Sequence, residues 1–240
     1  MRFATETDGV LLVDKPPGMT SHDVVAIARR ALGTKKVGHC GTLDPLATGL
    51  LLITIGRGTK IQDLLMSEDK EYSGTIRLGI ATDSQDADGK VTETQPVPDF
   101  SREQIEAAFA KFRGDLYQTP PMVSAIKKDG VPLYKLARQG KQVEREPRFV
   151  RVYAHEVKTI RLPEIDFRVV CSKGFYVRTY AHDIGRELGC GAHLQALRRT
   201  KSGRFAVDTA ITLEELRTFP HDQLVTRVLS LPTVSRLRGA

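Results

Sequence analysis

The sequence predicts an α+β fold with a largely antiparallel, mixed central sheet flanked by helices. Short apolar runs with strand patterning alternate irregularly with amphipathic stretches, without a regular βαβ rhythm. The chain has 240 residues, of which 40% are hydrophobic and 27% charged, as in an ordinary globular protein with a sizeable core. We find no internal repeat and no clear linker, so we expect a single domain over residues 1–240.

The first 66 residues are expected to hold two strands and two helices. Residues 9–14 form an apolar opening strand that a Pro-Pro-Gly turn closes. Ser21 is predicted to cap an amphipathic helix that ends at Gly33. Residues 50–55 are apolar throughout and predict a buried strand, and a short helix follows at 59–66.

The remaining elements have clearer periodicity. Residues 72–80 alternate as a strand, and Ser101 with Gln104 forms a capping box at the start of a helix. Residues 148–160 and 165–172 predict a long antiparallel pair joined by a proline turn. A basic strand and two short helices are expected at the end of the chain. The helix before them has apolar residues at helical spacing: Val177, Tyr180, Ala181, Ile184 and Leu188.

The charge distribution favours a polyanionic partner. The net charge is +7, and most of the excess lies in residues 127–151, which hold eight cations against three acids. A second cluster follows at Arg198, Arg199, Lys201 and Arg204. Two solvated faces would have the same composition, so both readings stay open at this point.

The sequence indicates a reduced, cytoplasmic protein. No apolar run approaches the roughly 20 residues that cross a bilayer, and the N-terminus lacks a secretory signal. The three cysteines, Cys40, Cys171 and Cys190, are far apart and odd in number, which is not typical of a disulfide framework.

The stretch from Gly38 to Gly49 is the strongest candidate for chemistry. It places one carboxylate, Asp44, on a turn before a wholly apolar strand, where an unpaired charge is costly. Asp-Pro is also an ordinary turn sequence, so a purely structural aspartate is the alternative. A lone carboxylate suits nucleophilic catalysis better than a two-carboxylate mechanism, and an arginine in contact would hold it ionised. Arg178 could supply that contact, and an ordinary surface arginine is the alternative interpretation of Arg178.

No metal or cofactor motif accompanies this aspartate. Residues 84–89 resemble the start of a calcium loop, but Ser84 and Gln95 occupy positions that need acids. Cys190 and His193 have no second pair at zinc spacing. Neither calcium nor zinc binding is therefore expected.

Several long motifs in order resemble the bacterial TruB-type tRNA pseudouridine synthases, over roughly residues 9–215. These motifs are DKPPGMTS from Asp14, GHCGTLDPLATG from Gly38, KEY from Lys70, TDSQDADG from Thr82, QTPPMVSAIK from Gln118, YVRT from Tyr176, and GCGAHL to LRR from Gly189 to Arg199.

The resemblance implies an isomerase that converts the T-loop uridine at tRNA position 55 into pseudouridine in a single catalytic domain. It also implies that the reaction uses neither a metal nor an organic cofactor. Asp44 would be the catalytic carboxylate, acting either on ribose C1′ or on the C2′ proton. Arg178 would pair with Asp44, and Tyr72 would stack under the flipped uracil. A core tyrosine on a strand face is the alternative reading of Tyr72.

Further residues would contact the substrate by the same resemblance. His39 would fill the gap left by the extruded base, whereas a satisfied turn histidine is the alternative. Tyr176 and Leu197 would line the uracil pocket, and Lys15 belongs to the matched motifs. Cys40 stands where the family often has a small hydroxyl residue, and we interpret it as a packing residue.

The basic segment at about 122–150 resembles the mobile thumb of this family. The expected phosphate contacts are Lys127, Lys128, Arg138 and Lys141. The resemblance implies the tRNA T-arm as partner and a monomer that needs no guide RNA and no membrane. We expect no C-terminal RNA-binding (PUA-type) module. A guide-dependent enzyme on ribosomal RNA and a non-catalytic tRNA-binding factor are the alternatives.

Overall fold

The computed structural model describes residues 7–124, 126–128, 130–141 and 143–239. Within them the chain forms two compact units. Unit 1 contains residues 1–72 and 198–240, and unit 2 contains residues 73–197. Strands β4 (Lys70–Leu78) and β12 (Ala192–Ser202) each begin in one unit and end in the other. Whether the two units act as a single catalytic domain over residues 1–240 stays a prediction.

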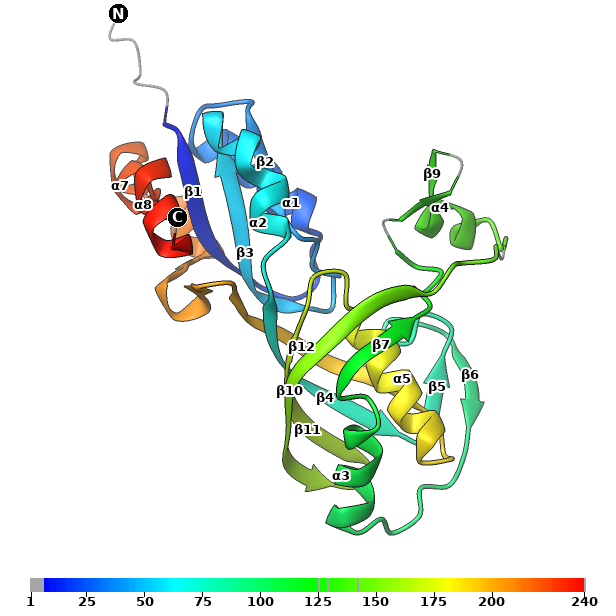
Figure 1. Ribbon diagram of the computed structural model, residues 1–240. Coiled ribbons are helices and arrows are strands. Elements are labelled where there is room, and N and C mark those ends of the chain that lie inside the picture. Colours follow the sequence, from blue (N-terminus) through cyan, green and yellow to red (C-terminus); the bar gives the residue numbers. More distant parts are fainter. Residues whose placement is uncertain (1–6, 125, 129, 142, 240) are drawn as a thin grey trace, which may run out of the picture. The chain divides into compact units, whose positions relative to one another are not determined.

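Unit 1 is built on a mixed sheet (Figure 1). Strand β1 pairs antiparallel with β3 and parallel with β14, β2 pairs antiparallel with β3, and the end of β12 pairs parallel with β3 and antiparallel with β13. These strands are β1 (Gly9–Lys15), β2 (Val37–Cys40), β3 (Thr48–Ile55), β13 (Phe205–Ala206) and β14 (Ile211–Thr212).

The helices of unit 1 come from both ends of the chain. Helix α1 contacts β2 and α6, and α8 contacts β1, so the apolar residues of β1 and β3 are enclosed as a core. The helices are α1 (Ser21–Ala31), η1 (Gly56–Ile61), α2 (Gln62–Met66), η2 (Val207–Thr209), α6 (Leu213–Thr218), α7 (His221–Arg227) and α8 (Leu231–Arg238).

Unit 2 has the strand order β12-β4-β11-β10-β7. Helices α3 and α5 contact each other, and α3 packs on β10 over an aromatic core that contains Phe109, Phe167 and Tyr180. Its other strands are β5 (Ile80–Thr82), β6 (Val91–Thr94), β7 (Gly114–Gln118), β8 (Lys127–Lys128), β9 (Val131–Pro132), β10 (Arg148–Arg161) and β11 (Glu164–Cys171). Its helices are α3 (Arg102–Ala110), α4 (Leu133–Arg138) and α5 (Val177–Glu187).

The predicted α+β class with a mostly antiparallel sheet is confirmed, and two local predictions are wrong. The residue that caps α1 is Thr20, which forms a capping box with Asp23. Ser21 is the first residue of the helix, and its hydroxyl bonds to the backbone of Leu43 instead. The described part of the C-terminal region holds three helices where two were expected, because the turn at Pro220 separates α6 from α7.

Candidate active site

The Asp44 loop joins β2 to β3 and is held by hydrogen bonds from outside it. The Asp44 carbonyl accepts the N–H of Ala47 at 3.0 Å, which closes the turn that the Asp-Pro sequence predicted. Leu43 donates its N–H to the Ser21 hydroxyl at 2.9 Å, and Pro45 accepts the N–H of Gly18 at 2.9 Å. The backbone on both sides of Asp44 is therefore tied to the start of α1, and the Asp44 side chain is half-buried.

Lys15 lies under this loop and is completely buried. Its ammonium donates to the carbonyls of Pro16, Met19 and Pro45, at 2.9, 2.8 and 3.4 Å. Burial lowers the pKa of Lys15 to about 8, although the nearby Asp44 carboxylate opposes this shift. These contacts assign Lys15 to bracing the loop, and its predicted contact with substrate stays untested.

His39 and Cys40 end strand β2, just before the loop. His39 is half-buried and meets the ring of His22 edge-on, with the ring centroids 5.0 Å apart. Burial lowers the pKa of His39 to about 4, so its imidazole is neutral at physiological pH. Burial raises the pKa of the Cys40 thiol to about 12, which fits the predicted role as a packing residue.

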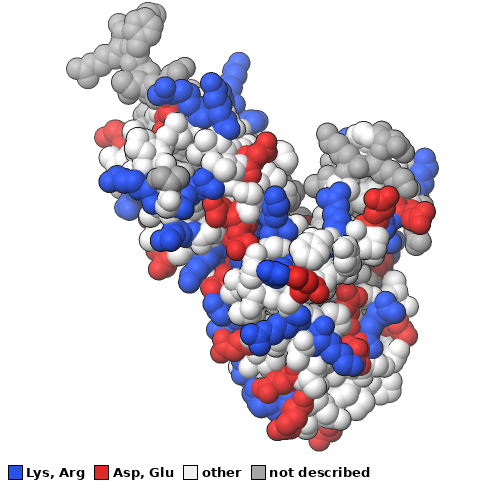
Figure 2. All heavy atoms as spheres, in the orientation of Figure 1, with Lys and Arg blue, Asp and Glu red and all other residues white. Residues whose placement is uncertain are grey.

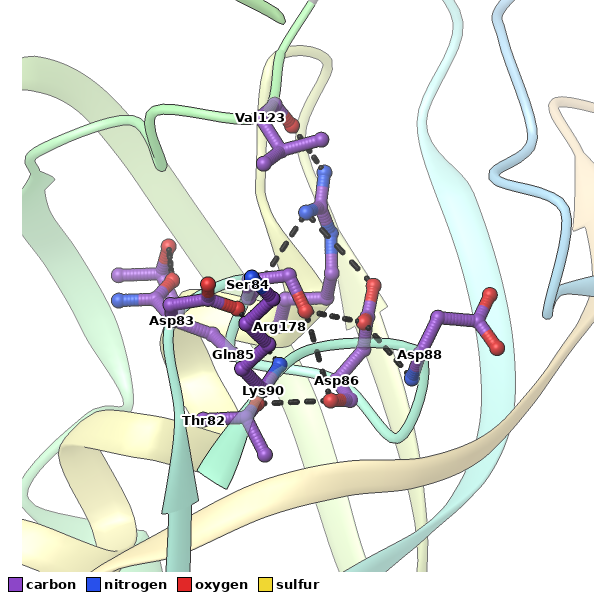
Figure 3. Close-up of polar contacts among 10 residues, drawn as sticks. Thr82, Asp83, Ser84, Gln85, Asp86, Asp88, Lys90, Val123 and Arg178 are labelled. Carbon is purple, nitrogen blue, oxygen red and sulfur yellow. Dashed lines mark hydrogen bonds and ion pairs between the residues drawn. The ribbon is translucent and has the colours of Figure 1, made fainter. Parts of the chain in front are cut away.

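Arg178 projects from the first turn of α5 and is 4% exposed. Its guanidinium donates to the carbonyl of Ser84 at 3.0 Å and to that of Val123 at 2.7 Å (Figure 3). One guanidinium nitrogen also lies 3.7 Å from a carboxylate oxygen of Asp86. The arginine is thus buried and not a surface residue, and acceptors within unit 2 help to orient its guanidinium.

The loop at residues 82–90 is shaped to present Asp86 to Arg178. The Thr82 hydroxyl donates to the Asp86 carbonyl at 2.7 Å, and the N–H of Asp88 donates to the Asp86 carboxylate at 3.2 Å. Gln85 has φ +66°, which turns the chain sharply just before Asp86. Sequence reasoning did not find Asp86 as the partner of Arg178, because its acid pattern was considered only for calcium.

Tyr176 immediately precedes α5 and is clamped by one buried side chain. Gln118 accepts the N–H of Tyr176 at 2.9 Å and donates to its carbonyl at 3.2 Å. Tyr72 on β4 and Leu197 on β12 are both buried on their strands. The structure places Lys15 close to Asp44 in unit 1, which also holds His39 and Tyr72, whereas Arg178, Tyr176 and Leu197 belong to unit 2. The predicted pairing of Arg178 with Asp44 therefore stays a prediction.

The segment predicted as a thumb contains the β8–β9 hairpin and helix α4, whose first residue, Leu133, is buried. The side chains of Lys127, Lys128 and Arg138 lie outside the described part of the structure, and Lys141 is exposed. On the face seen in Figure 2, Lys and Arg are interspersed with Asp and Glu. None of the described helices is long and apolar enough to cross a membrane.

Comparisons with known proteins agree with this geometry. Residues 29–177 match the N-terminal domain of the TruB family of pseudouridylate synthases, and residues 178–230 match the tRNA pseudouridylate synthase B C-terminal domain. The chain is 59% identical to tRNA pseudouridine synthase B of Opitutus terrae over 93% of both chains. It is 47% identical to the protein of that name from Syntrophotalea carbinolica, over 95% of this chain and 75% of the relative.

Among solved structures, a Cbf5–Nop10–Gar1 complex contains a chain of similar fold, with a TM-score of 0.76 and 30% identity. The match covers 96% of this chain and 62% of that one. Similarity of this extent, over both units and the motifs that hold Asp44 and Arg178, shows that the chain belongs to the TruB family of pseudouridylate synthases.

Proposed function

We propose that this protein isomerises the uridine at position 55 of the tRNA T-loop to pseudouridine, as a monomer in the cytoplasm without guide RNA. The observation that carries the proposal is the braced Asp44 loop in a chain 59% identical to a tRNA pseudouridine synthase B. A rigid turn that presents one carboxylate is what a reaction at a single ribose carbon requires. The three cysteines are buried thiols and not disulfides, in keeping with a reducing compartment.

The reaction breaks one bond and forms one bond at the same ribose carbon. The N1–C1′ bond breaks, the uracil turns, and C5 bonds to C1′. C5 then loses its proton to solvent and N1 gains one, so the product is an isomer of the substrate. In the proposal, Asp44 acts on C1′ or on the C2′ proton, while Arg178 holds Asp44 ionised.

The other predicted residues position the base. Tyr72 stacks under the flipped uracil, and Tyr176 and Leu197 line its pocket. His39 fills the space of the extruded base, which offsets part of the few kcal/mol that base flipping costs. The neutral imidazole favours this role, since an uncharged ring stacks in the loop without desolvating a charge.

Tritium release from uracil C5 tests the reaction directly. A T-arm transcript labelled at C5 is incubated with the protein, without guide RNA and without added metal. We expect wild type to release tritium and Asp44→Asn to bind the transcript without release. Asp208→Asn, an exposed aspartate of the same unit, is the matched control and should turn over normally. Normal turnover by Asp44→Asn would remove Asp44 from its role.

A guide-dependent activity is the second candidate, because the similar solved chain is part of a Cbf5–Nop10–Gar1 complex. Tritium release without guide RNA would exclude this second candidate.

A second experiment tests the proposed phosphate contacts of the basic segment at 122–150. The double variant Lys127→Ala with Lys128→Ala should weaken tRNA binding and reduce the slope of log K against log salt by about 1 for each lost phosphate contact. An unchanged slope would show that these lysines do not touch phosphate.

A further inference from the structure

Arg199 is the largest fully buried side chain among the described residues and is 1% exposed. In the sequence it belongs to a cluster of four cations that suggested a surface for phosphates. Strand β12 divides this cluster, because Arg198 is partly exposed and pairs with Asp14, whereas Arg199 points into unit 1. A cation enclosed in this way is not available to an RNA backbone, so its burial requires another explanation.

The guanidinium of Arg199 bonds to both ends of the Asp44 loop. Its Nε donates to the carbonyl of Leu50 at 2.7 Å, and its Nη2 donates to the carbonyl of Gly41 at 3.0 Å. Gly41 follows β2, and Leu50 lies near the start of β3, so these two carbonyls bracket the loop. One rigid, planar side chain therefore fixes the distance between the carbonyls of Gly41 and Leu50, at the two ends of the loop that carries Asp44.

Two glycines of the loop make room for Arg199. Gly49 has φ +98° and pairs with Arg199 in the parallel register of β3 and β12. A Cβ at Gly49 would lie 2.3 Å from the Arg199 carbonyl oxygen, and one at Gly41 (φ +84°) would lie 3.3 Å from its Nη1. Gly49 thus makes room for the backbone of β12 at residue 199, whereas Gly41 makes room for the Arg199 side chain.

An apolar residue at position 199 would be buried at a lower desolvation cost than arginine. Enclosing a cation carries a large desolvation cost, and a second buried cation, Lys15, lies close enough to repel Arg199. An apolar side chain would avoid that cost, but it would leave the carbonyls of Gly41 and Leu50 without these donors. What Arg199 adds is a defined loop geometry.

We propose that Arg199 is a positioning residue, which sets the backbone of the Asp44 loop and through it the direction of the Asp44 carboxylate. Arg199 would touch neither the substrate nor the reacting atoms. The expected effect of Arg199 on the reaction rate rests on the proposed function, whereas its effect on the loop backbone does not depend on the reaction.

The experiment compares Arg199→Met and Arg199→Lys with wild type. Single-turnover tritium release measures the chemical step, and filter binding measures the Kd for the T-arm transcript. A displacement of about 1 Å costs about 100-fold in rate, so we expect that loss for Arg199→Met. Arg199→Lys, which keeps the charge and can donate to one of the carbonyls, should recover part of the loss. The Kd should change by less than about threefold in both variants, because a buried residue makes no phosphate contact.

Amide hydrogen exchange reports on the loop itself. The N–H groups of Leu43 and Ala47 are hydrogen-bonded within the braced loop, and we expect both to exchange faster in Arg199→Lys. This measurement keeps the test valid if Arg199→Met does not fold. Arg238→Met is the matched control, since Arg238 pairs with Glu68 at the end of α8. It should lower the melting temperature without changing the rate constant or the exchange of the two amides.

Two results would overturn the proposal. One is a folded Arg199 variant with wild-type rate constant and wild-type loop exchange. The other is a weakened Kd with an unchanged rate at saturation, which would mean that Arg199 contacts phosphate. If wild type itself releases no tritium, the proposed function fails, and faster exchange of Leu43 and Ala47 would still support the positioning role.

Discussion

Neutralising Asp86 is expected to destabilise unit 2 by about 3 kcal/mol, because it removes a buried carboxylate that lies 3.7 Å from the buried guanidinium of Arg178. At 3.7 Å and an effective dielectric constant of about 20, two unit charges attract by about 4.5 kcal/mol. Asp86→Asn forfeits that attraction. It keeps the shape of the side chain and an oxygen that can accept the N–H of Asp88, and Arg178 keeps the carbonyls of Ser84 and Val123. The remaining acceptors explain why the expected loss is smaller than the Coulomb energy.

Tyrosine fluorescence during urea unfolding measures the unfolding free energy of unit 2, and so the expected loss in Asp86→Asn. The chain has no tryptophan, and five of its six tyrosines fall within residues 73–197, so the signal reports mainly on unit 2. Asp88→Asn is the matched control, because Asp88 is exposed in the same loop. Its unfolding free energy should stay within about 0.5 kcal/mol of wild type.

A double-mutant cycle with Arg178→Met isolates the pair. We expect a coupling energy between positions 86 and 178 of about 2–3 kcal/mol, with Asp86→Asn adding little once the arginine is gone. A loss below 1 kcal/mol in Asp86→Asn together with a coupling energy near zero would refute the reasoning. The 3.7 Å contact between Asp86 and Arg178 would then contribute nothing measurable to the stability of unit 2.

Three further predictions concern unit 1. The pKa of Lys15 is about 8 in the folded protein and 10.5 in the unfolded chain, so between these pH values the unfolded state binds more protons and stability rises with pH. From pH 8 to 9.5 the unfolding free energy of wild type, measured by urea titration, should therefore rise by about 2 kcal/mol relative to that of Lys15→Met. A constant difference between the two proteins would contradict this. Gly49→Ala should lower the unfolding free energy by at least about 2 kcal/mol, because its Cβ would lie 2.3 Å from the Arg199 carbonyl oxygen. Gly33 also has a positive φ but open space around it, so Gly33→Ala should lower the unfolding free energy by only about 1 kcal/mol. Equal melting temperatures of the two variants would exclude the steric argument. Because burial raises the pKa of Cys40 to about 12, iodoacetamide at pH 8 should alkylate this thiol only after unfolding, as mass spectrometry would show; rapid labelling of the folded protein would count against its burial.

Local pattern was sufficient to predict the regular elements of the fold. The apolar residues from Val177 to Ile184 recur at helical spacing, and α5 buries that stripe as expected. The capping box of Ser101 and Gln104 is present at α3, and the proline turn joins β10 to β11. These features depend on residues within about one helical turn or one hairpin of each other. The cap of α1 was displaced by one residue because Ser21 and Thr20 are equally suitable in sequence, and only the tertiary contact with Leu43 distinguishes them.

The contacts that shape the candidate site depend on residues far apart in the chain. Asp86 and Arg178 are 92 positions apart, and no local rule pairs them. Arg198 and Arg199 are neighbours with the same charge, yet one is paired at the surface and the other is enclosed. The alternation of side chains along a strand would have predicted this difference between Arg198 and Arg199, because successive side chains point to opposite faces of the sheet. A run of cations on a predicted strand should therefore be divided by face before it is interpreted as a binding surface.

The Asp44 loop shows why a structural interpretation and a catalytic one need not compete. A turn aspartate needs no buried cations around it, since water and its own backbone satisfy it. Here two cations, Lys15 and Arg199, are enclosed to hold the carbonyls of the loop, at a desolvation cost that apolar residues would avoid. Local rules are broken in this way where geometry is needed for function. The buried cations around the Asp44 turn thus support a catalytic Asp44 more strongly than the turn sequence does.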